Sequence, residues 1–112
     1  MGQKIVSLNV KPGGISVSGL LELTKDMLNS YKKRILLRWI PEVKGGITVQ
    51  ELKSLTSGMV DSNKVYLIEN LSEYIKGPIN ERDVLDFTGG MVNSYRKRII
   101  NVLLQKKVAL EG

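Results

Sequence analysis

The sequence predicts an all-α domain of three tandem helix-pair repeats. Shifted by 32 residues, the chain aligns with itself three times without a gap, and a fixed period of this size is typical of repeat architectures. Within each period, apolar residues recur at i, i+3 and i+7, the spacing of a buried helical stripe. Residues that start or stop helices recur at the ends and in the middle of each period. The aligned positions include Ile15, Ile47 and Ile79; Thr24, Thr56 and Thr88; Met27, Met59 and Met91; and Ser30, Ser62 and Ser94.

We expect one domain, because 112 residues lie in the usual size range of a single hydrophobic core. The expected repeats span residues 15–46, 47–78 and 79–112, behind an N-terminal arm of residues 1–14. Each repeat alone buries too little apolar surface to be stable, so the three are expected to stack into one helical domain.

The N-terminal arm has a different pattern from the repeats. Val6, Leu8 and Val10 alternate with Ser7 and Asn9, and this period of two predicts a short strand or extended segment. The arm would pack along the helices, pair with another chain, or stay mobile, because no partner strand is evident within this chain.

The first helix of each repeat is expected to begin after Ser16, Thr48 or Asn80. A side-chain oxygen at such a position can accept a hydrogen bond from an unpaired backbone N–H. Glu51, three residues after Thr48, completes the pattern of a capping box. The apolar stripe that follows is expected to be buried; its members are Leu20, Leu52 and Val84; Leu23, Leu55 and Phe87; and Met27, Met59 and Met91.

The middle of each repeat predicts a junction between two helices. Gly58 and Gly89-Gly90 favour the end of a first helix, and the Asn or Asp three residues after them favours the N-cap of a second. The first repeat has Lys25-Asp26 in place of Gly, so its first helix is expected to run further. The alternative is three long helices, each with only a kink at this point. Residues expected to be buried in the second helices are Ile35, Trp39 and Ile40; Leu67, Ile68, Leu71 and Ile75; and Ile99, Ile100, Leu103 and Leu104.

The composition excludes several kinds of chemistry. The chain has neither cysteine nor histidine, so it lacks disulfides, thiolate nucleophiles, the commonest metal ligand and the usual general base. We therefore predict no catalytic, cofactor or metal site and a non-enzymatic role. No apolar run approaches the ~18 residues of a membrane span, and the start of the chain lacks the pattern of a signal peptide. A cytoplasmic, intracellular protein is expected.

The net charge of +6 is distributed unevenly. Formal charge is +3 in residues 15–46, −1 in residues 47–78 and +2 in residues 79–112. Excess basic charge on the outer repeats suggests an anionic partner, and a helix N-terminus beside Lys or Arg can bind phosphate. The same residues can equally form a solvated helix face. Candidate contacts to an anion or nucleic acid are Ser30, Lys32, Lys33, Arg34, Arg38, Ser94, Arg96, Lys97, Arg98, Lys106 and Lys107.

One segment resembles a known repeat family. Residues 47–52 (ITVQEL), followed by Asp61-Ser62-Asn63-Lys64 and Leu67, are similar to a helical repeat of bacterial and animal proteins that is catalogued only as a domain of unknown function. The resemblance covers about one and a half repeats. It implies paired helices and carries no activity to transfer. Met59-Val60 stands where that family favours aromatic residues.

Two functional hypotheses follow from these patterns. The first is a non-enzymatic protein-interaction or assembly module that binds a protein partner or itself, because stacked helical repeats usually present binding surfaces. The second is a small basic protein that binds nucleic acid through its two Lys/Arg clusters. Clusters that share one face would favour nucleic acid, whereas clusters that point in opposite directions would favour protein assembly. No small-molecule substrate is indicated.

Overall fold

The computed structural model describes residues 14–111, and this part of the chain is helical throughout its regular elements. The all-α prediction is confirmed. The alternative of three long helices is wrong, because the described residues form six α-helices. The predicted arm lies outside the described residues except for Gly14. The elements are α1 (Val17–Thr24), α2 (Asn29–Trp39), η2 (Ile40–Glu42), α3 (Val49–Thr56), α4 (Asp61–Leu71), η3 (Ser72–Tyr74), α5 (Glu81–Thr88) and α6 (Asn93–Glu111).

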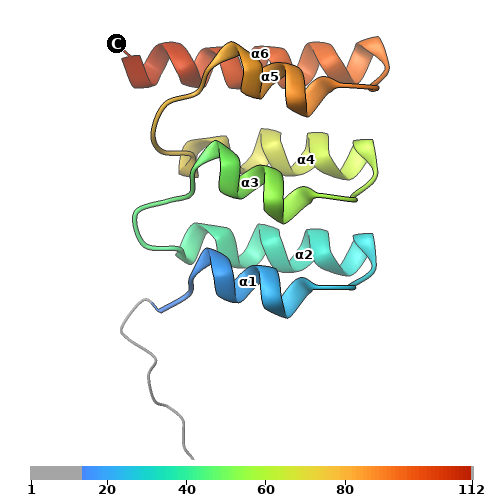
Figure 1. Cartoon of the computed structure of the whole chain (residues 1–112), viewed down its shortest axis with the longest axis vertical. Coiled ribbons are helices and arrows are strands. Elements are labelled where there is room, and N and C mark those ends of the chain that lie inside the picture. Colours follow the sequence, from blue (N-terminus) through green and yellow to red (C-terminus); the bar gives the residue numbers. More distant parts are fainter. Residues whose placement is uncertain (1–13, 112) are drawn as a thin grey trace, which may run out of the picture.

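The six α-helices lie in two layers (Figure 1). Helices α1, α3 and α5 form one layer, in which α1 packs on α3 and α3 on α5. Helices α2, α4 and α6 form the second layer, with α4 in the middle. Successive helix pairs therefore lie side by side. Among the described helices, the pair α3–α4 has a neighbouring pair on each side, whereas α1–α2 has one neighbouring pair.

Each helix of the first layer begins as the sequence predicted. Ser16 accepts a hydrogen bond from the backbone N–H of Gly19, 3.0 Å away. Thr48 and Glu51 form the predicted capping box at the start of α3. A second capping box, which the sequence analysis did not anticipate, joins Asn80 and Asp83 at the start of α5.

The same three helices end at matching threonines. The hydroxyl groups of Thr24, Thr56 and Thr88 each donate to the carbonyl oxygen four residues earlier, at 2.7 to 2.9 Å. The predicted extension of the first helix is wrong, because α1, α3 and α5 have the same length, eight residues each. Asp26 takes the left-handed conformation (φ 62°) that Gly58 and Gly90 take in the other junctions (φ 79° for both). Asp is one of the few residues that tolerates this region, so it ends the helix where glycine would.

The predicted N-caps of the second helices are also wrong by one residue. Asn29, Asp61 and Asn93 are the first residues of α2, α4 and α6, not the residues before them. The carbonyl oxygens of Leu28, Val60 and Val92 accept the first intrahelical hydrogen bonds, so these aliphatic residues hold the N-cap position. The side-chain oxygen of Asn29 makes a different contact, described below.

The core runs through all three helix pairs and is mostly aliphatic. Leu36 is fully buried although the sequence analysis omitted it. Two residues expected to be buried are not: Leu23 is 73% exposed and Leu104 is 39% exposed. Both belong to the outer helix pairs, and within the described part of the chain no further helix pair packs against their outer side. Ile35, Trp39 and Ile100 are partly buried and pack against the core.

Candidate interaction edge

Three short connections line up along one edge of the molecule. The α1–α2, α3–α4 and α5–α6 connections lie one above another in Figure 1, whereas the longer connections lie at the opposite edge. Each short connection presents an aliphatic residue to solvent. The exposed fractions are 69% for Leu28, 54% for Val60 and 61% for Val92. We refer to these three residues as the aliphatic ladder.

The local backbone explains why the aliphatic ladder is exposed. Each of the three residues is at the N-cap position, where the chain leaves a left-handed residue two positions earlier and turns into the second helix. Leu28 and Val60 have extended backbone angles and make no side-chain capping hydrogen bond. Their side chains therefore neither cap the helix nor fill the core.

One hydrogen bond links Asn29, the residue after Leu28, to Val60. The side-chain Oδ1 of Asn29 accepts from the backbone N–H of Val60 at 2.7 Å. This bond joins the start of α2 to the start of α4 across neighbouring helix pairs. It holds the α1–α2 connection next to the α3–α4 connection, although Asn29 and Val60 are 31 residues apart in the sequence.

The sequence patterns assigned no role to Leu28, Val60 and Val92, and their exposure was not predicted. The sequence did contain a signal for this exposure. In all three periods, Leu or Val stands between the repeated Met and the following Asn or Asp. Helix N-caps favour Ser, Thr, Asp and Asn and disfavour Leu and Val. If the second helices are taken to begin at the Asn or Asp, the Leu or Val before it becomes the N-cap. An aliphatic residue then holds a position that favours polar residues.

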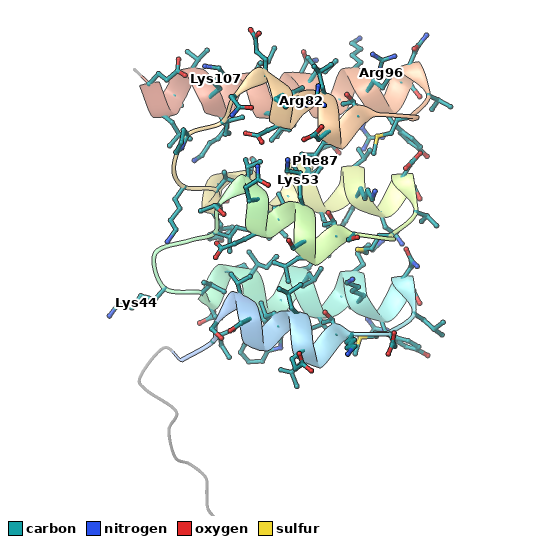
Figure 2. All side chains as sticks on the ribbon, viewed as in Figure 1. Lys44, Lys53, Arg82, Phe87, Arg96 and Lys107 are labelled. Atoms are coloured by element: carbon teal, nitrogen blue, oxygen red, sulfur yellow. The ribbon has the colours of Figure 1, made fainter. Side chains whose placement is uncertain are left out.

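The predicted basic clusters begin at the same edge. They lie near the starts of α2 and α6, in one layer, with α4 between them. In Figure 2, Arg96 lies at this end of α6, whereas Lys107 lies toward the other end. Exposed residues among the candidates are Ser30, Arg34, Arg38, Ser94, Arg96, Lys97 and Arg98; Lys32, Lys33, Lys106 and Lys107 are half-buried.

Several of these cations already have partners within the chain. Arg38 pairs with Glu42 at 3.6 Å, and Lys107 pairs with Glu111 one turn away. The Lys33 ammonium lies 4.5 Å from the centre of the Tyr66 ring. These contacts reduce the positive charge that is available to an external anion.

Arg98 is the most strongly engaged of the predicted basic residues. Its Nε and Nη2 donate to the two carboxylate oxygens of Glu69 in α4, at 2.9 and 2.6 Å. This two-point hydrogen bond lowers the pKa of Glu69 and raises the pKa of Arg98. Arg98 is thus better described as a link between α6 and α4 than as a free phosphate ligand.

A second polar cluster joins α3 to α5. Lys53 Nζ donates to Asp86 at 2.9 Å and to Asp83 at 3.3 Å, and Gln50 Nε2 also donates to Asp83 at 2.9 Å. The hydrogen bond between Lys53 and Asp86 raises the pKa of Lys53 and lowers the pKa of Asp86. Figure 2 places Lys53 between the two helices. Its partners satisfy the cluster internally, so its role is to hold two helix pairs together.

Within residues 14–111, no three or more carboxylate side chains come together in a way that could hold a metal ion. None of the helices in that range is both long enough and apolar enough to cross a membrane.

No protein-family model matches the sequence, and neither a curated protein nor a solved structure is similar to it. The resemblance to the helical-repeat family noted above therefore stays a prediction.

Proposed function

We propose that the chain is a non-enzymatic protein-interaction module built from three copies of one helix-pair repeat, residues 15–46, 47–78 and 79–112. A protein partner would bind along the aliphatic ladder. The observation that carries this proposal is the exposure of an aliphatic side chain at the same position of all three helix pairs.

The energetics of the N-cap position support this role. Leu or Val in place of Ser or Asn at an N-cap costs a helix roughly 1 kcal/mol. Within residues 14–111 this loss is not offset by burial, because Leu28, Val60 and Val92 are all more than half exposed. A partner that covered them would recover about 1.5–3 kcal/mol for each side chain that became fully buried.

The arrangement of the three residues also suits a partner. Single exposed aliphatic residues are common on protein surfaces and need no explanation. Here they recur along one edge on connections that follow one another in space (Figure 1). Neighbouring packed helices are ~10 Å apart, so the ladder would offer apolar contacts at a regular interval. Such a row fits an elongated protein segment with its own spaced apolar residues.

A triple variant tests this proposal: Leu28→Ser, Val60→Ser and Val92→Ser. Serine is a good N-cap residue, so the variant should fold at least as stably as the parent chain. Affinity capture with the intact chain as bait should recover a binding protein that the triple variant no longer retains. A partner retained by the triple variant would show that the ladder is not the binding surface.

A matched control separates this surface from general stickiness. Leu85 and Val108 are 57% and 68% exposed and lie outside the ladder. The variant Leu85→Ser/Val108→Ser should keep the partner. Loss of the partner in both variants, or no partner for the intact chain, would contradict the proposal.

A second candidate function is nucleic-acid binding, because the two basic clusters begin at one edge rather than at opposite ones. Among residues 14–111, no ion pair engages Lys32, Arg34, Arg96 or Lys97. These four could contact phosphates along the starts of α2 and α6. Duplex binding would then weaken steeply with salt, by about one log unit of affinity per log unit of salt for each contact.

Titration of a labelled duplex and a labelled single strand tests this second candidate. The variant Lys32→Glu/Lys97→Glu should bind less tightly and show a shallower salt dependence. The control Lys44→Glu/Lys76→Glu makes the same change in net charge away from this edge; Figure 2 places Lys44 at the opposite one. Equal losses in both variants would indicate attraction to net charge only, and no binding at low salt would remove this candidate.

A further inference from the structure

The first helix pair has an open apolar groove. The groove has a volume of about 390 Å³ and is lined by residues of the first helix pair and by Ile15, which precedes the N-cap Ser16. The lining residues are Ile15, Leu20, Leu23, Met27, Ile35 and Trp39. It is separate from the aliphatic ladder. Except for Leu20, these side chains are partly or largely exposed.

The same positions are buried elsewhere in the molecule. Thirty-two residues further on, at the counterparts of Ile15, Leu23, Met27, Ile35 and Trp39, no side chain is more than 5% exposed. The groove residues are thus of the same apolar kind as residues that a neighbouring helix pair covers in the middle of the molecule. The counterparts are Ile47 (0%), Leu55 (0%), Met59 (5%), Leu67 (0%) and Leu71 (1%).

At the opposite end of the molecule, formed by α5 and α6, charged residues replace two apolar residues that are buried in the middle pair. Val49 of α3 is 2% exposed, and its counterpart in α5 is the charged Glu81. Val65 of α4 is fully buried, and its counterpart in α6 is Lys97. End repeats of stacked folds need a polar outer surface for solubility. The α5–α6 end carries such substitutions, whereas the groove of the α1–α2 end does not.

We propose that residues 3–10 of the same chain occupy this groove. Ile15 is itself a wall of the groove, so the preceding chain starts there. The segment carries Val6, Leu8 and Val10 at alternate positions, which would place three apolar side chains on one side of an extended strand. Its polar partners Ser7 and Asn9 would then face solvent.

The length and attachment of the segment support this occupant over a second copy of the chain. Eight extended residues reach about 26 Å, and the 11-residue helix α2 along which they would lie is about 16 Å long. A short tether gives the attached segment an effective concentration on the order of millimolar. A second copy present at micromolar concentration would therefore be outcompeted.

Trp39 is the only tryptophan of the chain and lines the groove, so it reports occupancy directly. The full chain is compared with the variant Val6→Asp/Leu8→Asp by tryptophan emission and by quenching with acrylamide. If the segment covers the groove, the variant should show a red-shifted emission and lose its protection from the quencher. The matched control Ser7→Asp/Asn9→Asp adds the same charge on the other side of the segment and should behave like the parent.

A second variant addresses the groove itself. Leu23→Asp alters a side chain that the described residues leave 73% exposed, so α1 should still fold, and circular dichroism checks this. The proposal expects the same red shift and loss of protection as in Val6→Asp/Leu8→Asp. Identical emission in the parent and in both variants would overturn it.

The same measurement identifies the competing occupant. Emission of the parent chain should not change with protein concentration if the segment binds within its own chain. A concentration-dependent blue shift that persists in Val6→Asp/Leu8→Asp would show that a second copy covers the groove and would overturn the proposal. Neither result depends on finding the partner of the aliphatic ladder.

Discussion

Leu23 and Leu55 occupy the same place in consecutive helix pairs, and their surroundings differ completely. Leu55 is fully buried, and Leu23 is 73% exposed. Both follow the same N-cap pattern and lie in eight-residue helices that end at a threonine. Among residues 14–111 the difference comes from the neighbours, because α3 lies between two helices of its layer and α1 packs on one of them. In a molecule built from similar units, position within the row therefore determines burial more than residue type does.

The largest expected effect sharpens this comparison directly. Leu55→Ala should lower the free energy of unfolding by about 2–5 kcal/mol, because it leaves a cavity in a fully packed core. Leu23→Ala should lower it by a smaller amount, because the described residues leave 73% of that side chain outside the core. Urea denaturation of both variants measures the two values. Equal losses would mean that Leu23 is covered as completely as Leu55.

The next effect compares two capping boxes. Glu51 caps α3 locally, whereas Asp83 caps α5 and also accepts hydrogen bonds from Gln50 and Lys53 of α3. Glu51→Ala should cost about 1 kcal/mol, the typical value for a lost cap. Asp83→Ala should cost roughly 2–4 kcal/mol, because it also removes the two hydrogen bonds that Asp83 accepts from α3. Thermal denaturation of both variants checks the order, which a larger loss for Glu51→Ala would contradict.

A smaller difference in stability is expected between substitutions in the α3–α4 and α1–α2 connections. Gly58 has φ of 79° and no atom within 4 Å of the position where a Cβ would lie, so Gly58→Ala should cost about 1–2 kcal/mol from backbone strain alone. Asp26→Gly should change stability by less than about 1 kcal/mol, because glycine relieves the strain but loosens the unfolded chain. Chemical denaturation distinguishes the two. A strong loss in Asp26→Gly would show that the Asp26 side chain has a further role.

The smallest effect concerns pH. The pKa of Glu69 is lowered in the folded chain by its hydrogen bonds from Arg98, so the ionised carboxylate stabilises the fold. This contribution is fully present above the ordinary pKa of 4.5 and is lost as the pH falls through the lower folded value. Stability measured between pH 6 and pH 3 should therefore fall less steeply in Glu69→Gln than in the parent. An unchanged slope would mean that the ion pair is too exposed to contribute.

Sequence reasoning succeeded where the signal was local. Ser16, Thr48 and Asn80 begin the first-layer helices, and Gly58 and Gly90 end two of them, because capping and left-handed turns depend on a few adjacent residues. It failed at Asp26, where a residue other than glycine adopts the same turn. Leu23 and Leu104 were misjudged because periodicity shows which side of a helix is apolar and not whether another helix covers it.

The candidate surface was less predictable for the same reason. The basic residues were found by composition, but the ion pair of Arg98 was not, because its partner Glu69 belongs to another helix. The exposure of Leu28, Val60 and Val92 depends on a one-residue difference in where the second helices begin. Helix boundaries read from sequence are uncertain by that amount, so an N-cap was assigned to the Asn or Asp that follows.

The contacts between neighbouring helix pairs also have a kinetic consequence. Each pair packs mainly on the next along the chain, so contacting residues are separated by about one period. Folding in such a row can start in one pair and spread to its neighbours, and it should be fast for the size of the domain. Amide exchange should then be slowest in α4, which has helices on both sides, and faster in α1. A molecule of this kind opens from its ends, so the outer helix pairs should exchange their amide protons before the central one does.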